Sequence, residues 1–416
     1  MAYTETKTTN YGQRVSGSFK GIGTGLILFA GATALLWWNE GRAVHRAQDI
    51  KEVGKNATHV EDIQTIAPEG QLIHANGTAQ TTETLTDGTF GVSVQALSLS
   101  RDVEYYQWVE HSRTETKEKI GGTKEEITTY TYEREWVSSP INSSDFHDPD
   151  YKGVNSTLAG INFEDKTTYA ENVTFGAYKM PANFISSVAS CAGQANTTLD
   201  LSPEVLAELN NSIAKTQSTS FTSQLTDMLT PGTYEYVHVS GNQIYLGKNE
   251  SNPAVGDVRV KFTNRQPSAE ISLVAVVKGD SFTEYKTKNG SNDRYIYSGT
   301  KSLDEMMQSA EESNEIMTWV LRVLGIILVC TSLKMIFAIL VTLLKVLPFL
   351  ANILNWGVSL ICNIIGVAWS FIIIGLAWVF YRPLLGITLL VIAGALIFFL
   401  CSKKKKNQDG AVANPV

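Results

Sequence analysis

Four stretches of the chain are apolar over lengths that suit a membrane-spanning helix. Gly21 to Trp38 is uncharged and lies between Lys20 and Glu40. At ~1.5 Å per helical residue it reaches ~27 Å, close to the ~30 Å of a bilayer's hydrocarbon core. The C-terminal quarter contains the other three. The predicted spans are residues 21–38, 319–341, 356–380 and 384–401, with an interfacial cytoplasmic loop at 345–355 and a hairpin at Tyr381, Arg382 and Pro383.

The pattern changes between the first and second spans, where residues 39–315 read mainly as β structure. Asp102 to Glu110 and Glu126 to Val137 are rich in β-branched and aromatic residues, and Gly121 with Gly122 predicts the hairpin tip between them. Later strands are predicted at Thr233–Ser240, Gln243–Leu246, Asp257–Phe262, Ala269–Lys278 and Arg294–Tyr297.

Two helices interrupt this β pattern. One is predicted over Pro203–Lys215, capped by Ser202, and the other begins at Ser302, where Glu305 completes a capping box. The second helix can continue directly into the second span. We therefore expect an α+β membrane protein with one N-terminal and three C-terminal spans, and a large β-rich extracytoplasmic domain, barrel-like or sandwich, inserted after the first span.

Charge divides the chain into the same parts. Residues 1–38 carry a net charge of +2, residues 39–315 carry 23 basic and 39 acidic side chains, a net −16, and residues 316–416 carry +7. This distribution excludes a soluble cytosolic enzyme, a disordered chain and a nucleic-acid binder with a basic face.

The positive charges also predict an orientation. Lys403 to Lys406 indicate a cytoplasmic tail at 402–416. Four spans then place the tail at 1–20 on the same side and residues 39–315 on the opposite side. A five-span chain is one alternative. A cleaved signal peptide is another, although Trp37 and Trp38 make a poor cleavage site.

Few residues suggest chemistry. Asp145 to Asp150, with His147, could hold a divalent cation, but a solvated acidic turn explains them better. Cys191 has no signature of a reactive thiol and cannot form a disulfide within residues 39–315, where it is the sole cysteine. We expect no enzyme activity, cofactor or metal.

Two motifs in the first span suggest helix packing. Gly21 and Gly25 form a small-residue stripe that permits close contact with another helix. Glu40 and Arg42 lie where the span leaves the bilayer. They either anchor the helix at the interface or form an ion-pair lock with Arg322 or Arg382 of the later spans.

Several strings together resemble the LUMA family, also called transmembrane protein 43. They are Asn39-Glu40-Gly41-Arg42, the string Tyr106-Gln107-Trp108 with Glu110, Trp136, Gly256-Asp257, and Tyr381-Arg382-Pro383. The resemblance covers nearly the whole chain in the same order. It implies one N-terminal span, a large lumenal domain and three C-terminal spans, and it supplies no catalytic residues.

The resemblance also implies a setting and a role. Animal members reside in the endoplasmic reticulum and inner nuclear membrane, where they self-associate and are linked to emerin and lamins. Bacteria also encode members, so a bacterial inner membrane is the other expected location. We expect a non-enzymatic membrane organiser that forms homo-oligomers, contacts the lipid bilayer and binds membrane or envelope proteins. Lipid or small-ligand handling by the β-rich domain is the alternative.

Overall fold

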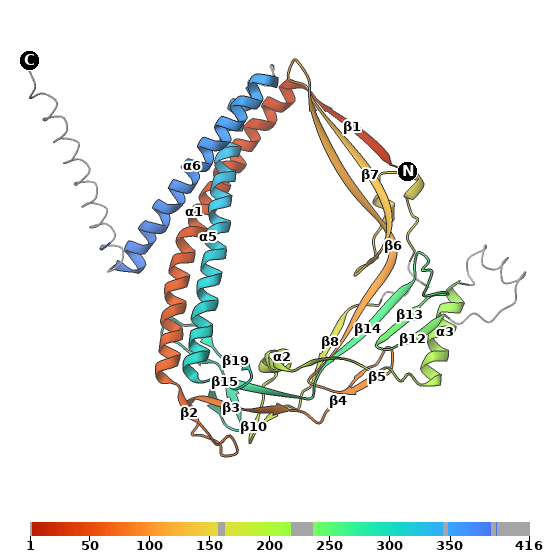
Figure 1. Cartoon of the computed structure of the whole chain (residues 1–416), viewed down its shortest axis with the longest axis vertical. Coiled ribbons are helices and arrows are strands. Elements are labelled where there is room, and N and C mark those ends of the chain that lie inside the picture. The colour runs from red at the N-terminus through yellow and green to blue at the C-terminus, as the bar shows by residue number, and fades with distance from the viewer. Residues whose placement is uncertain (1, 157–162, 218–235, 344–347, 384–387, 389–416) are drawn as a thin grey trace, which may run out of the picture. The chain divides into compact units, whose positions relative to one another are not determined.

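The computed structural model describes residues 2–156, 163–217, 236–343, 348–383 and 388 (Figure 1). Its contacts divide the chain into two compact units. The β unit comprises Met1–Thr6, Val53–Glu115 and Ile127–Met307. The helical unit comprises Lys7–Glu52, Thr116–Glu126 and Gln308–Val416.

The larger sheet of the β unit has eight strands. Its main path runs β1-β7-β6-β14-β13-β12, with β8 beside β6 and β11 beside β14. The strands are β1 (Tyr3–Thr9), β6 (Ser98–Glu118), β7 (Lys124–Val137), β8 (Lys166–Tyr169), β11 (Gln194–Asn196), β12 (Val237–Ser240), β13 (Gln243–Leu246) and β14 (Val258–Arg265).

The second sheet has seven strands, with the path β10-β9-β3-β15-β16 and with β19 beside β15 and β2 beside β3. The strands are β2 (Thr58–Val60), β3 (Leu72–Gln80), β9 (Thr174–Phe175), β10 (Tyr178–Lys179), β15 (Ser268–Lys278), β16 (Ser281–Thr283) and β19 (Tyr295–Ser298). Two small pairs, β4 (Thr84–Asp87) with β5 (Val92–Gln95) and β17 (Tyr285–Lys286) with β18 (Asn292–Asp293), and helices α2 (Ala182–Cys191) and α3 (Pro203–Gln217) complete the unit.

One apolar core receives side chains from both sheets, among them Ile73 and Leu273 from one and Val260 and Phe262 from the other. Buried and partly exposed residues alternate along β14, so one face of the strand is covered by the core. Val258, Val260 and Phe262 are buried, whereas the residues between them are partly exposed. This period of two is what a strand with one covered face requires.

The strand predictions are confirmed for the described residues. The predicted Gln243–Leu246 coincides with β13, and every other predicted strand overlaps an observed one, although residues 233–235 lie outside the described part. Gly121 and Gly122 have φ of 91° and 80°, values that glycine adopts readily, and they form the expected tip between β6 and β7. Helix α2 was missed because its four serine and cysteine positions obscure the buried face of Phe184, Ile185 and Val188.

Both predicted helix caps are present. At the start of α3, Ser202 Oγ accepts from the Val205 N–H at 3.4 Å. Before α5 (Leu303–Leu343), the Ser302 N–H donates to Glu305 at 2.7 Å and the Glu305 N–H donates to Ser302 Oγ at 3.3 Å. Helix α5 then continues without interruption into the predicted second span, as expected.

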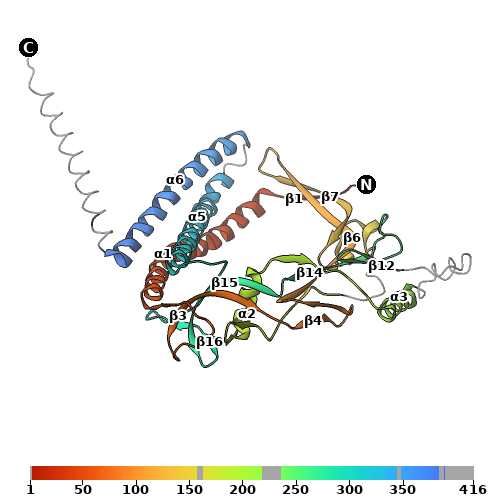
Figure 2. The same ribbon diagram turned by 60° about the horizontal axis from the view of Figure 1, so that its bottom comes forward.

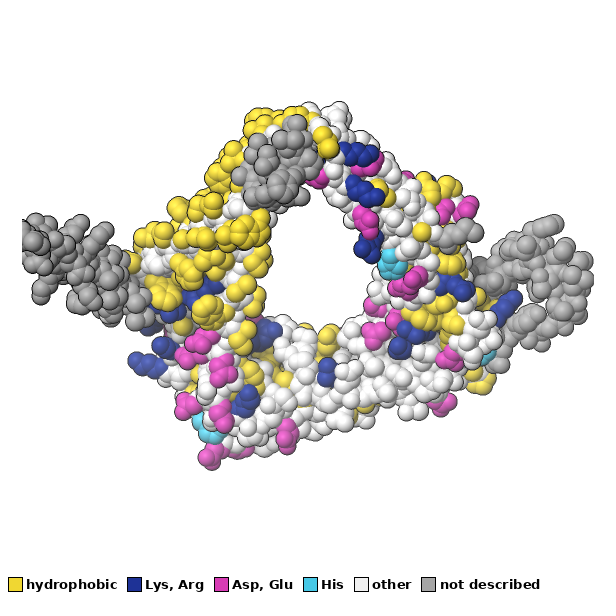
Figure 3. Space-filling model, turned by 45° about the horizontal axis from the view of Figure 1, so that its top comes forward, with side chains coloured by type: hydrophobic (Ala, Val, Ile, Leu, Met, Phe, Trp, Pro, Cys, Tyr) yellow, Lys and Arg dark blue, Asp and Glu magenta, His cyan; other side chains and the backbone are white. Residues whose placement is uncertain are grey.

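Three helices of the described chain are long and apolar enough to cross a membrane: α1 (Tyr11–Asn56), α5, and residues Asn355–Tyr381 of α6 (Pro348–Tyr381). They lie side by side in Figures 1 and 2. Hydrophobic side chains cover much of their surface in Figure 3. Trp356, Ile364 and Phe371 are among the exposed apolar residues of α6. The predicted fourth span, 384–401, and the tail at 402–416 lie outside the described residues.

Helix α6 begins earlier than the sequence suggested. Residues 348–355, expected to form most of an interfacial loop, are helical. Pro348 occupies the first helical position, where its missing N–H costs nothing. Asn352 and Asn355 therefore did not mark a break in the helix.

The helical unit also contains the tip of the β6–β7 hairpin. Arg14 of α1 forms an ion pair with Glu118, and its guanidinium donates to the Gly122 carbonyl at 3.0 Å. The N-terminal segment expected as a tail is partly strand β1, which pairs with β7. A bilayer crossed once by α1 would separate residues 3–14 from residues 39–56. That all of 39–315 lies on one side of the bilayer stays a prediction, and the contacts between α1 and the β6–β7 tip provide a way to test it.

A disulfide test distinguishes the two arrangements. With cysteines at Arg14 and Glu118 in a background lacking the native thiols, the observed contact predicts a cross-link in native membranes under mild oxidation. A matched pair at Arg14 and Glu115 provides the distance control. The polar hairpin cannot cross hydrocarbon unaided. Absence of the cross-link, with Ile120→Cys labelled only from the face opposite the N-terminus, would restore the one-sided arrangement.

Candidate functional site

A buried ion pair joins α1 and α5 just beyond the apolar part of α1. Arg322 donates from Nε to Glu40 Oε1 at 2.6 Å and from Nη2 to Oε2 at 2.7 Å. Glu40 is fully buried and Arg322 is 8% exposed. Such fork-to-fork pairing is the strongest geometry available to a carboxylate. The structure therefore favours the ion-pair lock over simple interfacial anchoring.

Tryptophans surround this pair and connect it to α6. Trp378 Nε1 donates to Glu40 Oε2 at 2.7 Å. The Arg322 guanidinium carbon lies 4.9 Å from the Trp319 ring centroid and 5.5 Å from that of Trp378. Aromatic faces stabilise a cation when water is absent. One carboxylate is thus bound by groups from α5 and α6 at once.

A second polar group centres on Arg42, two residues after Glu40 on α1. Arg42 donates to Asn39 Oδ1 at 3.2 Å, to Asn314 Oδ1 at 3.1 Å and to Thr318 Oγ1 at 2.9 Å. Asn39 donates to the Thr318 carbonyl at 3.0 Å, and Asn314 to the Ala43 carbonyl at 2.9 Å. We call Asn39, Glu40, Arg42, Asn314, Thr318, Arg322 and Trp378 the interhelical cluster.

Gly41 has a steric role beside the cluster. A Cβ at this position would lie 2.7 Å from Tyr381 Cζ, closer than real side chains approach. The Tyr381 ring also contacts Trp37, with centroids 5.9 Å apart. Asn39, Glu40, Gly41, Arg42 and Tyr381 are therefore brought together. The side chains of Arg382 and Pro383 form no hydrogen bond or ion pair with them within the described chain.

The two glycines predicted to pack differ in the structure. A Cβ at Gly25 would lie 2.9 Å from Ile336 Cγ1 and 3.1 Å from the Ser332 carbonyl oxygen of α5. A Cβ at Gly21 meets nothing within 4 Å in the described chain. Of the two glycines, Gly25 therefore lies against α5, whereas Gly21 has no neighbour of this kind in the described chain. Gly366 provides a contact of the same kind on α6, against Cys330.

The remaining family-motif residues support the connection that follows β7. Gln107, 1% exposed, accepts from the Ile141 N–H at 2.6 Å and donates to the Ser156 carbonyl at 3.2 Å. The Trp108 N–H donates to Asn155 Oδ1 at 2.8 Å. Glu110 accepts from the Tyr132 hydroxyl at 2.6 Å and from the His147 N–H at 2.7 Å. The Gln107 and Glu110 side chains thus bind backbone groups, and the Asn155 side chain binds the backbone N–H of Trp108, which is a structural task.

Tyr106, Trp136 and Asp257 form a neighbouring group. The Trp136 ring lies 5.2 Å from that of Tyr106, and the Arg259 guanidinium lies 4.3 Å from its centroid. Asp257 accepts from Ala254 N–H at 2.7 Å and from the Tyr245 hydroxyl. Burial raises the pKa of Asp257 above its usual value. Gly256, with φ of 103°, donates its N–H to the Tyr106 carbonyl at 2.9 Å.

The other candidates from the sequence have structural roles. Asp148 caps a short 3-10 turn by accepting from the Asp150 N–H, and His147 Nδ1 lies 2.9 Å from Glu110 Oε1. Both observations agree with a turn rather than a cation site. The half-buried Cys191 donates to the Ser187 carbonyl, and burial raises the pKa of its thiol, which favours the unreactive form.

A histidine pair between β2 and β3 was not anticipated. His59 and His74 are register partners, and their Nδ1 atoms are 2.9 Å apart. Nε2 of His74 lies 3.0 Å from the Lys301 carbonyl oxygen, so it carries the proton, and His74 Nδ1 accepts from His59. Burial chiefly, and His59 further, lower the pKa of His74 below its ordinary value of 6.5.

This pair predicts acid sensitivity of the β unit. A lowered histidine pKa means that the unfolded chain binds the proton more tightly, so the contribution of His74 is present above pH 6.5 and is lost as the pH falls below it. We expect the melting temperature to drop by several degrees between pH 7.5 and 5.5. His74→Gln should flatten this drop, and an unchanged drop in that variant would contradict the role assigned to His74.

Comparison with known proteins agrees with this geometry. A profile of the family described as transmembrane protein 43 matches residues 105–383. The human transmembrane protein 43 is 27% identical over 405 residues, covering 94% of this chain and 92% of that protein, and the mouse protein is 27% identical over 383 residues, covering 89% and 87%. The Drosophila melanogaster homolog is 26% identical over 383 residues, covering 89% and 91%.

No solved structure gives a significant match. The family profile nevertheless spans well over half of the 416 residues and includes both the segment from Tyr106 to Asp257 and the helices that carry Arg322 and Tyr381. The three membrane-capable helices are those of an integral membrane protein. The chain belongs to the transmembrane protein 43 family.

Proposed function

We propose that this protein is a non-enzymatic membrane organiser, which self-associates through its helices and binds membrane proteins through its β unit. The observation that carries the proposal is the interhelical cluster. Its seven polar side chains join α1, α5 and α6. Each of the hydrogen bonds described above is accepted by another member of the cluster or by a backbone carbonyl. Such an arrangement suits a permanent junction better than a site that must release a substrate.

The continuity of the helices supports the same role. Helix α1 runs to Asn56 and α5 starts at Leu303, so both extend well past the predicted spans at 21–38 and 319–341. Residues 39–315 carry a net charge of −16, which complements basic partner surfaces and disfavours nucleic acid.

Open glycines favour self-association. Gly17 and Gly21 are four residues apart on α1, and a Cβ at either meets nothing within 4 Å in the described chain. Small residues at this spacing allow close approach of two helices in lipid. Lipid handling, by contrast, calls for an apolar cavity. The cavity between β6 and β14 in the described part of the chain is instead lined by polar groups.

Cross-linking in liposomes tests the proposal. At a fixed protein-to-lipid ratio we expect a specific dimer or higher oligomer, with a yield reduced several-fold by Gly21→Leu. Ile364→Leu, at an exposed position of α6, is the matched control and should retain the yield. Monomers alone at every ratio, together with no membrane protein captured from native membranes by a photo-reactive group on the β unit, would overturn it.

A further inference from the structure

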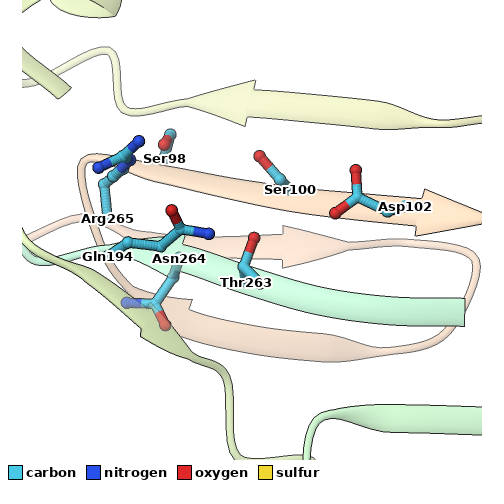
Figure 4. Close-up of a pocket in the computed structure, with 7 residues that line it drawn as sticks. All are labelled: Ser98, Ser100, Asp102, Gln194, Thr263, Asn264 and Arg265. Atoms are coloured by element: carbon cyan, nitrogen blue, oxygen red, sulfur yellow. The ribbon is translucent and has the colours of Figure 1, made fainter. Parts of the chain in front are cut away.

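The outer face of the larger sheet contains a polar cavity of about 230 Å³ between β6, β11 and β14 (Figure 4). Ser98 pairs in register with Arg265 and Ser100 with Thr263, while Gln194 of β11 also pairs with Arg265. Directly paired residues project to the same face of a sheet. Figure 4 shows these side chains and Asp102 on that face, whereas Asn264 points to the other side.

The cavity has hydrogen-bonding capacity that the described chain leaves unused. The side chains of Ser98, Asp102, Gln194 and Thr263 form no hydrogen bond within that part of the chain, although Ser98 is only 4% exposed. Ser100 shares a hydrogen bond with Thr167 at 3.0 Å, and Arg265 donates to the Ala192 carbonyl at 3.0 Å. Unused polar groups in a concave surface are the usual basis of ligand specificity.

The chemistry of these groups indicates the class of ligand. Hydroxyl and amide side chains both donate and accept, as do the hydroxyls of a sugar. One carboxylate and one guanidinium line the cavity, so a fully charged ligand would meet one unfavourable neighbour. Tyr169 lies directly opposite Ser98 on β8 and is 42% exposed, which offers an aromatic surface beside the polar groups.

We propose that this cavity binds one uncharged pyranose unit, held by Asp102, Gln194 and Thr263 with Tyr169 at its edge. The site goes beyond the organising role and does not depend on it. The volume is smaller than the ~300 Å³ at which pockets for larger ligands begin, which suits a single ring.

Saturation-transfer NMR on the full-length protein, in a detergent without a sugar headgroup, tests the site. The probes are glucose, galactose and N-acetylglucosamine, with inorganic phosphate as the charged comparison. We expect saturation transfer to at least one sugar. Adding phosphate should not displace that sugar. Thr263→Val and Asp102→Ala should weaken the signal at least tenfold without lowering the melting temperature.

Thr86→Val is the matched control for the threonine change. Thr86 is a strand residue outside the cavity, hydrogen-bonded to Ser93 at 2.8 Å, so its replacement should leave sugar binding intact. Absence of transfer to all three sugars overturns the proposal. So does a signal that survives both cavity variants, or displacement of the sugar by phosphate, which would identify an anion site instead.

Discussion

Glu40→Gln is expected to destabilise the helical unit by about 3–5 kcal/mol, because it leaves the buried Arg322 guanidinium without its counter-charge. Glutamine preserves the shape of the side chain, so the loss reports charge rather than packing. The buried thiols of Cys330 and Cys362 provide the readout. Their reaction with a fluorescent maleimide during heating, with Cys191 and Cys401 replaced by serine, should begin at a clearly lower temperature in the variant.

Two further variants distinguish loss of the Glu40–Arg322 ion pair from the general effect of removing a carboxylate. Glu312→Gln removes an exposed carboxylate of α5 whose described partner is Gln308, and it should change the transition little. Combining Glu40→Gln with Arg322→Met removes both charges and should recover much of the loss, since replacing a whole buried pair is often nearly neutral. Equal melting of the Glu40 and Glu312 variants would contradict the structural role assigned to the pair.

Gly25→Leu is expected to have the second-largest effect, and Gly21→Leu almost none. The new side chain at Gly25 would meet backbone atoms of Ser332 and Ile336, which cannot move without shifting α5. Overpacking of this kind costs about 1–3 kcal/mol. At Gly21 the same substitution enters open space in the described chain.

The comparison is internally controlled, because both changes add the same apolar side chain to the same helix. Thiol reactivity of Cys330 and Cys362, measured in dilute detergent micelles where association is negligible, again gives the stability of the helical unit. A shift for both variants, or for Gly21→Leu alone, would show that α1 and α5 approach each other along a different face.

Much of this architecture could be predicted from residues close together in sequence. Alternation in β14, glycines at the β6–β7 tip and the Ser302–Glu305 capping box are local signals, and each gave the correct element. The family strings likewise pointed to Glu40 and Asp257. What they could not supply is the distant partner. Arg322 was one of two predicted ion-pair partners for Glu40. Nothing in the sequence near Trp378 indicated that its indole would donate to the same carboxylate.

The pairing of β1 with β7 shows where local signals end. Positive charges report where short loops prefer to lie, but pairing between β1 and β7 depends on residues more than a hundred positions apart. No periodicity within Tyr3–Thr9 identifies its neighbour. Similarly, Gly21 and Gly25 are equivalent in sequence, and only the position of α5 distinguishes them.

The separation of Glu40 and Arg322 by 282 residues has a consequence for biosynthesis. At about 5–20 residues per second, the ribosome needs on the order of tens of seconds to make the cation after the anion has reached the membrane. During that interval Glu40 must remain hydrated at the bilayer edge, so the closed helix junction can form only after translation has passed Arg322. The pair therefore makes junction assembly a late event, and truncated chains that end before α5 would present an unsatisfied carboxylate to quality control.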